Sequence, residues 1–361
     1  MDNTQNAVPD ITALDKNFRT ETSFAGYDID FFNVREEPFE IHGLLHDGER
    51  YRRIPLNVSN DYPGVRDLSI HTAGGRVCFV TDSPYIAVSA VMPGMYLMPH
   101  MTFLGSAGFD MYVRRGTKQT YAGSFIPDKN NHESVHSLVK LGDKTPREII
   151  IDFPLYSGVK ELFVGIEKGS TLEKWSGYSR KTPMVFYGSS ITQGGCASAP
   201  GTCYEAIISR RFDSDYINLG FSGNAKGEPA ILEYIAGLDM SLFLYDYDYN
   251  APSCEHLEKT HYAGYAAVRR AHPDIPIIMA SRPNYSKPDE AGRSRRDIIA
   301  ASYERALADG DKNVYFADGK KEFAAFYDEG FAVDGTHPTD HGFYVMAKVF
   351  GDIIEKAISK K

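Results

Sequence analysis

Cysteine is scarce in this sequence, which contains only four among its 361 residues: Cys78, Cys196, Cys203 and Cys254. They form neither a CxxC pair nor a Cys/His pattern with the spacing of a zinc motif, which excludes that class of site. A small disulfide-stabilised domain is excluded as well, because such domains are dense in cysteine. This usage predicts four reduced thiols and a cytoplasmic protein.

An excess of positive charge and long apolar runs are also lacking. Lys and Arg number 39 against 48 Asp and Glu, which gives a formal net charge of −9. A chain this acidic is a poor candidate for binding nucleic acid or an anionic membrane surface. Apolar runs such as Ile149–Phe153 fall far below the roughly 20 residues that span a bilayer. The first residues lack the basic and apolar regions of a secretory signal, so we expect none.

The length and the remaining composition fit an ordinary globular protein. Hydrophobic residues make up 42% of the chain and charged residues 24%, values close to the average for globular domains. A chain of 361 residues is long for one domain and comfortable for two. The two halves differ in pattern, and we expect the boundary in the polar stretch that follows Trp175.

Residues 1–178 have the pattern of an all-β domain. Short apolar stretches alternate with Gly- and Pro-containing turns, and the predicted strands include Arg76–Thr81, Tyr85–Val91, Phe109–Arg114 and Ile149–Phe153. Strands at this spacing are typical of a β-sandwich or barrel.

Residues 183–361 alternate between predicted strands and helices. The predicted strands are Met184–Tyr187, Tyr216–Leu219, Leu242–Tyr245, Ile275–Met279 and Val314–Ala317. The predicted helices are Cys203–Phe212, Glu228–Ile235, Glu255–Arg270, Ala291–Ala308 and Gly342–Ile358. This alternation favours an α/β fold, in which helices cover both faces of a parallel sheet. Functional sites in such sheets form at the carboxyl ends of the strands.

The first of these strands ends in a Gly-Ser-Ser sequence that carries the candidate nucleophile, Ser190. A serine at a tight strand-to-helix turn presents its hydroxyl at the rim of the sheet, where a nearby base can activate it. The alternative is an ordinary serine-rich turn. No Gly-Lys-Ser/Thr follows, which excludes a Walker A loop, and the GxGxxG spacing of a dinucleotide site is absent.

The next two strands end in residues suited to stabilising an oxyanion. Gly223 follows the second strand, where a backbone N–H can approach a negatively charged oxygen closely. Asn250 follows the third strand and offers a side-chain amide for the same purpose, although an Asn before Pro252 also fits a simple turn.

The candidate base and its partner stand near the C-terminus. Asp334 precedes His337 by three residues on one short loop, so its carboxylate can hold Nδ1–H and leave Nε2 free to accept a proton. His341 is an alternative base. The order of Ser190, Gly223, Asn250 and then Asp334 with His337 follows successive strand ends, which brings them to one edge of the predicted sheet.

Other residues allow alternative interpretations. A thiol nucleophile at Cys196 or Cys203 is disfavoured because Ser190 already occupies the turn. The segment containing Asp248 and Tyr249 could bind a sugar ring or form a half-buried strand end. Asp110, Met98 and His100 are more often structural residues of a β domain, but they could reach the cleft.

These motifs resemble those of the SGNH (GDSL-type) hydrolase superfamily. Tyr187–Gly194 is similar to its first block, with Ser190 at the nucleophile, and the sequence around Gly223 is similar to its second. Asn250 takes the asparagine of the third block, and Asp334 and His337 match the closing DxxH. Two departures stand out: the usual Asp before the nucleophile is Ser189, and the third block reads Asp248–Ala251. The resemblance implies a three-layer, flavodoxin-like α/β sandwich.

The N-terminal half has a resemblance of its own. Gly108–Tyr112 (GFDMY) is similar to the GxDLY motif of the β-rich domain that precedes certain SGNH hydrolases. Two-domain carbohydrate esterases join a jelly-roll-like module to an SGNH domain in the same way. The resemblance therefore implies a jelly-roll-like N-terminal domain.

Together the motifs predict a serine esterase that needs neither metal nor cofactor. The catalytic residues are Ser190, His337 and Asp334; the oxyanion donors are the backbone N–H groups of Ser190 and Gly223 and the Asn250 amide; Tyr249 and Asp248 contact the substrate. The small residues after Ser190 favour acetyl esters, and the polar rim favours a carbohydrate. A general acylesterase, thioesterase or acyltransferase is the alternative within enzymes, and a non-catalytic carbohydrate-binding protein is the alternative outside them. A homodimer is compatible with the sequence.

Overall fold

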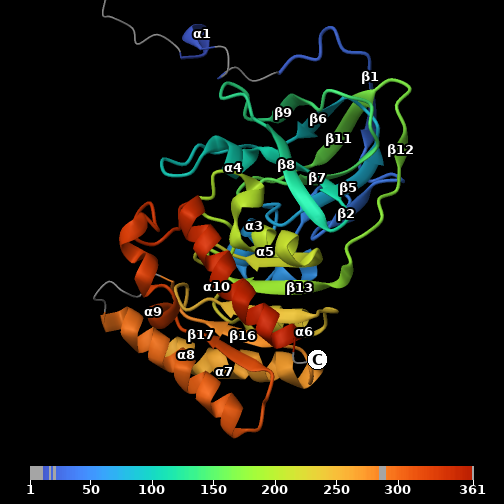
Figure 1. The fold of residues 1–361 in the computed structure, drawn as a ribbon. Coiled ribbons are helices and arrows are strands. Elements are labelled where there is room, and N and C mark those ends of the chain that lie inside the picture. Colours follow the sequence, from blue (N-terminus) through green and yellow to red (C-terminus); the bar gives the residue numbers. More distant parts are fainter. Residues whose placement is uncertain (1–10, 16–17, 19–21, 284–289, 360–361) are drawn as a thin grey trace, which may run out of the picture.

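The computed structural model describes residues 11–15, 18, 22–283 and 290–359, and Figure 1 shows how their elements are arranged. The opening residues, for which the sequence predicts no secretory signal, lie largely outside the described part. Antiparallel strands occupy the first half of the chain, and a parallel sheet with helices occupies the second (Figure 1).

Two antiparallel sheets form the N-terminal half. The first has the strand order β1 (Ile29–Asn33), β11 (Glu161–Glu167), β6 (Tyr85–Val91) and β9 (Ser134–Lys140). The second has the order β12 (Leu172–Glu173), β5 (Arg76–Thr81), β10 (Arg147–Asp152), β7 (Phe109–Arg115) and β8 (Lys118–Phe125), and β2 (Glu40–His42) pairs with β5. Side chains from both sheets, such as Val88 and Ile151, share one buried cluster, so the two sheets form a β-sandwich. The strands predicted in this half are confirmed.

Short elements connect these strands. They are α1 (Ile11–Leu14), β3 (Leu45–His46), β4 (Tyr51–Arg52), α2 (Leu56–Ser59), α3 (Pro63–Leu68) and α4 (Phe103–Ala107). Helix α4 begins where the Thr102 hydroxyl accepts a hydrogen bond from the N–H of Gly105, a side-chain cap of the kind that satisfies an otherwise unpaired donor. The same hydroxyl donates to the carbonyl of Ser198 in the other half of the chain.

The C-terminal half is built on a five-stranded parallel sheet. Its order is β14 (Ser214–Gly220), β13 (Arg180–Gly188), β15 (Leu242–Asp246), β16 (Ile277–Ala280) and β17 (Val314–Ala317). The helices are α5 (Tyr204–Phe212), α6 (Pro229–Ala236), α7 (Cys254–Ala271), α8 (Glu290–Ala308), α9 (Gly319–Glu322) and α10 (Asp340–Ile358). Two 3₁₀ segments, Pro200–Thr202 and Ala324–Glu329, complete this half.

The parallel sheet is buried on both faces, as predicted. Phe186 packs in the cluster that includes residues of α5 and α10, whereas its neighbours Val185 and Tyr187 pack in the cluster that includes residues of α6, α7 and α8. This alternation follows from the two-residue period of a strand. Figure 1 shows α7 and α8 on one side of the sheet and α5 and α10 on the other, which confirms the three-layer α/β arrangement.

Buried charged residues join the two halves. Arg114 on β7 forms a bidentate pair with Asp213, with Nε and Nη2 lying 3.0 Å and 2.7 Å from the two carboxylate oxygens. Arg76 on β5 is 2% exposed and pairs with Asp215. Because an unpaired buried charge is costly, these pairs fix how the β-sandwich sits against the α/β half.

None of the helices among the described residues is both long enough and apolar enough to cross a membrane.

Candidate active site

Three neighbouring strands end together at the carboxyl edge of the parallel sheet. Gly188, the last residue of β13, is paired with Gly220 of β14 on one side and with Asp246 of β15 on the other. A Cβ at position 188 would lie 2.0 Å from the backbone oxygen of Asp246, so only glycine fits there. The backbone N–H of Ser189 then donates to the same Asp246 oxygen over 3.0 Å. This contact fixes the turn that carries Ser190.

The structure brings Ser190, His337 and Asp334 into one hydrogen-bonded chain. Ser190 Oγ lies 2.8 Å from His337 Nε2, and His337 Nδ1 lies 2.7 Å from Asp334 Oδ2. The second carboxylate oxygen, Oδ1, accepts the backbone N–H groups of Thr336 and His337 over 2.9 Å and 2.8 Å. The loop that precedes α10 therefore holds the carboxylate through both of its oxygens.

The hydrogen bonds also determine which atoms of Asp334 and His337 carry protons. Partial burial alone would raise the pKa of Asp334, but the hydrogen bonds from the His337 ring and from the backbone of His337 and Thr336 outweigh it and lower the pKa to about 2. A carboxylate that is ionised at neutral pH requires a proton on His337 Nδ1 and leaves Nε2 as the acceptor for the Ser190 hydroxyl. The arrangement is that of a nucleophile, a base and an orienting acid.

The loops after β14 and β15 lie against each other near Ser190, His337 and Asp334. Gly223 has φ +68°, a left-handed conformation that favours glycine. Asn250 donates its side-chain amide to the carbonyl of Phe221 over 2.9 Å. The structure thus joins the two loops that carry the predicted oxyanion donors.

A pocket of about 120 Å³ opens beside Ser190, with walls from both halves of the chain. Its lining residues are Met98, His100, Met101, Tyr156, Gly195, Cys196, Ser222 and His337. Tyr156 donates its hydroxyl to the backbone carbonyl of Ser190 over 3.1 Å, and His100 Nε2 lies 3.9 Å from Asp334 Oδ2. Sequence reasoning missed Tyr156, because no motif marks it, and favoured a purely structural role for Met98 and His100.

Asp110, in contrast, has the structural role that the sequence favoured. Its side chain is fully buried and accepts the backbone N–H of Gly201 at both oxygens, over 3.1 Å and 3.0 Å. It therefore ties β7 to the segment that follows the nucleophile loop.

The alternative nucleophiles and the alternative base differ from Ser190 and His337 in ionisation or in position. Burial, together with the negative charge of Asp334, raises the pKa of the Cys196 thiol to about 11, and burial raises the pKa of the Cys203 thiol well above its ordinary value, so neither is a thiolate at neutral pH. All four cysteines are free. His341 is exposed in the first turn of α10, and His337 is the imidazole that contacts Ser190.

One group of potential metal ligands occurs among the described residues. The ligand atoms of His100, Cys196 and His337 lie within 4.8 Å of one another. His337 Nε2 already contacts the Ser190 hydroxyl, and a metal ion bound there would compete with that contact. The chemistry of these groups therefore fits the serine-histidine pair better than a metal centre.

The two predicted substrate contacts lie outside this pocket. Asp248 is 1% exposed, and its Oδ2 accepts the backbone N–H of Arg282 over 3.1 Å while its backbone carbonyl accepts from Arg295 over 2.6 Å. Asp248 therefore does not line the pocket beside Ser190, and a substrate contact at this residue stays a prediction. Tyr249 is partly exposed, and the guanidinium of Arg282 stacks 3.8 Å from its ring centroid.

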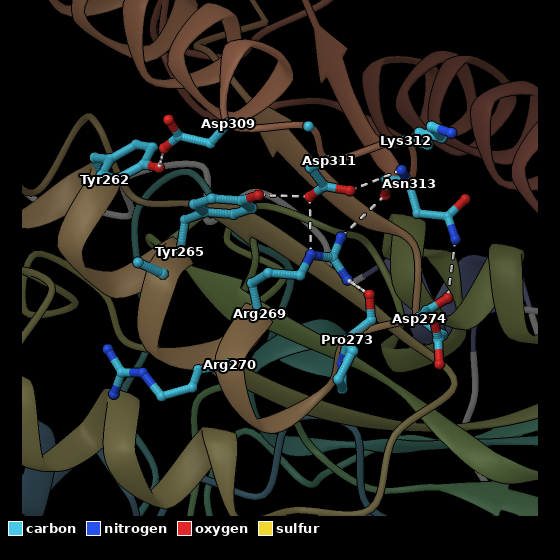
Figure 2. Close-up of a pocket in the computed structure, with 12 residues that line it drawn as sticks. Tyr262, Tyr265, Arg269, Arg270, Pro273, Asp274, Asp309, Asp311, Lys312 and Asn313 are labelled. Carbon is cyan, nitrogen blue, oxygen red and sulfur yellow. Dashed lines mark hydrogen bonds and ion pairs between the residues drawn. The ribbon is translucent and has the colours of Figure 1, made fainter.

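A larger cavity, of about 700 Å³, lies elsewhere, between α7 and the segments that precede β16 and β17. These segments enter the sheet at its amino edge, opposite the edge that carries Ser190. Figure 2 shows Tyr265, Arg269 and Asp311 turned toward one another in its wall. Arg269 Nε lies 2.8 Å from Asp311 Oδ2. Its other nitrogens donate to the carbonyls of His272, Pro273 and Ile275, which follow α7, and to the carbonyl of Asn313, which precedes β17. These contacts anchor the helix end, and cavity size alone does not identify the active site.

Buried carboxyl groups lie beneath the nucleophile turn. Asp246 is 3% exposed, and its Oδ2 lies 3.5 Å from the hydroxyl of Thr192. Burial, and then the neighbouring charge of Asp248, raise the pKa of Asp246 to about 8. The group is therefore neutral at pH 7 and keeps a proton that the unfolded chain, with an ordinary carboxyl pKa near 3.8, has lost.

This difference predicts how stability depends on pH. Because the folded chain binds the extra proton between about pH 4 and pH 8, stability falls as pH rises through that window and levels off above it, by about 1.4 kcal/mol per pH unit at most. We expect Asp246→Asn to remove this fall in stability. In urea unfolding at pH 5, 6.5 and 8, the free energy of unfolding of the variant relative to that of the wild type should increase by on the order of 3 kcal/mol from pH 5 to pH 8. Asp239→Asn, at an exposed position, is the control. A constant difference between Asp246→Asn and wild type across the window would contradict the prediction.

Comparison with known proteins agrees with this geometry. Residues 181–355 match the model of the GDSL-like lipase/acylhydrolase family, and residues 29–172 match the model of the N-terminus of SGNH-hydrolase-type esterases, named GxDLY. These matches confirm the resemblance that the sequence motifs carry in both halves. No curated protein matches the chain.

Solved structures share the fold over nearly the whole chain. A putative GDSL-like lipase from Bacteroides ovatus is 29% identical with a TM-score of 0.81, and the match covers 92% of this chain and 98% of that one. The salicylyl-acyltransferase SsfX3 from a tetracycline biosynthetic pathway is 20% identical with a TM-score of 0.73, covering 89% and 95%. A family two carbohydrate esterase from Clostridium thermocellum is 14% identical with a TM-score of 0.56, covering 80% and 94%. The last two likenesses show a shared fold alone.

Proposed function

We propose that this chain, an SGNH-type ester hydrolase whose residues 181–355 belong to the GDSL-like lipase/acylhydrolase family, removes short acyl groups, acetyl above all, from carbohydrate esters. The observation that carries the proposal is the chain of contacts from Ser190 Oγ to His337 Nε2 at 2.8 Å and from His337 Nδ1 to Asp334 at 2.7 Å. Under the proposal, residues 1–178 form the β-rich domain and residues 183–361 the catalytic domain.

The first half of the reaction forms an acyl-enzyme. Ser190 Oγ attacks the ester carbonyl carbon while its proton passes to His337 Nε2, and the carbonyl electron pair moves onto the oxygen. Asp334 stabilises the imidazolium that results. When the tetrahedral intermediate collapses, the bond to the alcohol oxygen breaks and His337 delivers the proton to that oxygen.

The second half returns the enzyme to its starting state. Water attacks the acyl carbon and gives a proton to His337, and the second tetrahedral intermediate then expels Ser190 Oγ, which regains the proton. In both intermediates the oxyanion accepts hydrogen bonds from the backbone N–H groups of Ser190 and Gly223 and from the amide of Asn250. Removing one donor of this kind costs about 3 kcal/mol of transition-state stabilisation in comparable sites.

The size of the pocket supports a short acyl group. Its volume of about 120 Å³ lies well below the roughly 300–1,000 Å³ of pockets that hold drug-sized ligands. An acetyl group fits such a space, whereas an octanoyl chain would have to leave it. The thioether side chains of Met98 and Met101 give part of its wall an apolar character suited to a methyl group.

Structural relatives favour a carbohydrate leaving group. Proteins with the same two-part fold include the family two carbohydrate esterase named above and an acetyl xylan esterase from Butyrivibrio proteoclasticus. The alternative reaction is acyl transfer, in which an alcohol accepts the acyl group in place of water. The fold shared with the salicylyl-acyltransferase favours this alternative. Release of free acetate indicates hydrolysis, whereas a new ester formed when a second alcohol is present indicates acyl transfer.

Hydrolysis of p-nitrophenyl acetate, butyrate and octanoate tests the acyl preference. We expect kcat/KM to be highest for acetate and to fall by at least tenfold toward octanoate, because one extra methylene that an apolar pocket does not accommodate costs about 1–3 kcal/mol. Acetylated xylan and mannan oligosaccharides then test the leaving group, with acetate release as the readout. A preference for octanoate would contradict the proposal and favour a lipid or thioester substrate.

A further inference from the structure

Gln193 lies three residues after the nucleophile and is completely buried. Its side-chain Oε1 accepts the backbone N–H of Ser222 over 3.1 Å, and Ser222 immediately precedes Gly223. Its Nε2 donates to the carbonyl of Leu155 over 3.2 Å and lies 3.1 Å from His71 Nδ1. One amide therefore connects the nucleophile turn, the loop after β14 and the N-terminal half.

The backbone partners fix which way this amide points. Ser222 offers an N–H and needs the oxygen, whereas Leu155 offers a carbonyl and needs the NH₂ group, so a flipped amide would lose both bonds. His71 Nδ1 must then accept the second Nε2–H. Burial and the nearby charge of Arg53 lower the pKa of His71 to about 3, which keeps the ring neutral and able to accept.

The backbone of the same turn and loop is bonded as well. The N–H of Gln193 donates to the carbonyl of Ser189 over 3.0 Å, and Asn218 donates its amide to the carbonyl of Thr192 over 2.6 Å. From the N-terminal half, Arg53 donates to the carbonyl of Gly220 and lies over the ring of Phe221, 4.7 Å from its centroid. The loop that carries Gly223 is thereby held from two sides.

We propose that Gln193 is a positioning residue that sets the distance between Ser190 and the Gly223 N–H, with His71 holding its amide in the working orientation. The inference rests on the proposed function, because it assigns Gly223 to the oxyanion. Gln193 touches neither substrate nor reacting atoms. Its effect passes through the Ser222 backbone, since an oxyanion donor displaced by a fraction of an ångström stabilises the transition state less while ground-state binding is little changed.

The test compares Gln193→Met, which keeps the length of the side chain and loses its hydrogen bonds, with the wild type on p-nitrophenyl acetate. We expect kcat to fall by about 100-fold with KM within about twofold. The inhibition constant of ethylboronic acid, which forms a tetrahedral adduct with the nucleophile, should rise by a similar factor. Gln119→Met on β8 is the matched control and should leave all three quantities unchanged.

A pair of variants at His71 keeps the inference testable if Gln193→Met does not fold. In His71→Asn the side-chain oxygen can replace Nδ1 as acceptor, so kcat should stay near the wild-type value, whereas His71→Leu should lower kcat by about tenfold at constant KM. A higher KM with unchanged kcat and boronate affinity, or wild-type kinetics in both Gln193→Met and His71→Leu, would overturn the inference. Absence of any Ser190-dependent turnover in the wild type would instead overturn the proposed function.

Discussion

Replacing Ser190 with alanine is expected to lower kcat for p-nitrophenyl acetate by on the order of 10⁴- to 10⁶-fold. The substitution removes the atom that forms the acyl-enzyme, and it leaves His337 with nothing to deprotonate except water. The oxyanion donors remain, so a small residual rate above that of uncatalysed hydrolysis should persist. Stopped-flow or long-time absorbance measurements of p-nitrophenol release at saturating substrate give the ratio.

The matched control is Ser198→Ala, a partly exposed serine eight residues along the same loop. It should keep wild-type kcat and KM, which excludes a general effect of losing a hydroxyl from this segment. A fluorophosphonate probe adds an independent readout, because it should label the wild type and Ser198→Ala but not Ser190→Ala. Turnover of Ser190→Ala within tenfold of the wild type would show that Ser190 is not the nucleophile.

The α/β half was predictable from the sequence because its strands and helices have different periods. Strand β17 has the predicted bounds, Val314–Ala317, and α5, α7 and α10 begin within two residues of their predicted starts. A parallel strand buried on both faces is a short continuous apolar run, and the helices between such runs have one apolar side. The strand order is not encoded in this pattern, but the common carboxyl edge is, and this edge brings Ser190, His337 and Asp334 together.

Residues that act across the two halves could not be predicted. Tyr156 contacts the Ser190 carbonyl from a position 34 residues earlier in the chain, and His71 contacts Gln193 across 122 residues. Neither lies in a motif, and their positions depend on how the β-sandwich docks through buried ion pairs such as Arg114 with Asp213. Packing between domains has no local period that a sequence pattern could reveal.

The burial of Asp248 could not be predicted for a different reason. Polar and aromatic residues after a buried strand are typical of an exposed rim, and the Asp-Tyr repeat after β15 fits that description. The side chain is buried because the segment around Arg282 and the side chain of Arg295 cover the loop. Burial raises the pKa of Asp248 to about 6, whereas the charges of those two arginines lower it. A tertiary cover of this kind is not visible from the residues beside Asp248.

Replacing Asp334 with asparagine is expected to lower kcat by about 10⁴-fold, because the amide should select the wrong tautomer of His337. The backbone N–H groups of Thr336 and His337 both donate to Oδ1 of Asp334, so the oxygen of an asparagine must stay on that side. Its NH₂ group then faces His337 Nδ1 and donates to it. The ring proton moves to Nε2, which can no longer accept the proton of Ser190.

Asp334→Ala separates this effect from the simple loss of a negative charge. Alanine offers no donor to Nδ1, so His337 can adopt either tautomer, and we expect Asp334→Ala to retain at least as much activity as Asp334→Asn despite removing more of the side chain. ¹⁵N chemical shifts of the labelled imidazole report which nitrogen carries the proton in each variant. Activity of Asp334→Asn within tenfold of the wild type, or a protonated Nδ1 in that variant, would mean that the backbone of this loop does not fix the amide and that His337 keeps its basic Nε2 without help from Asp334.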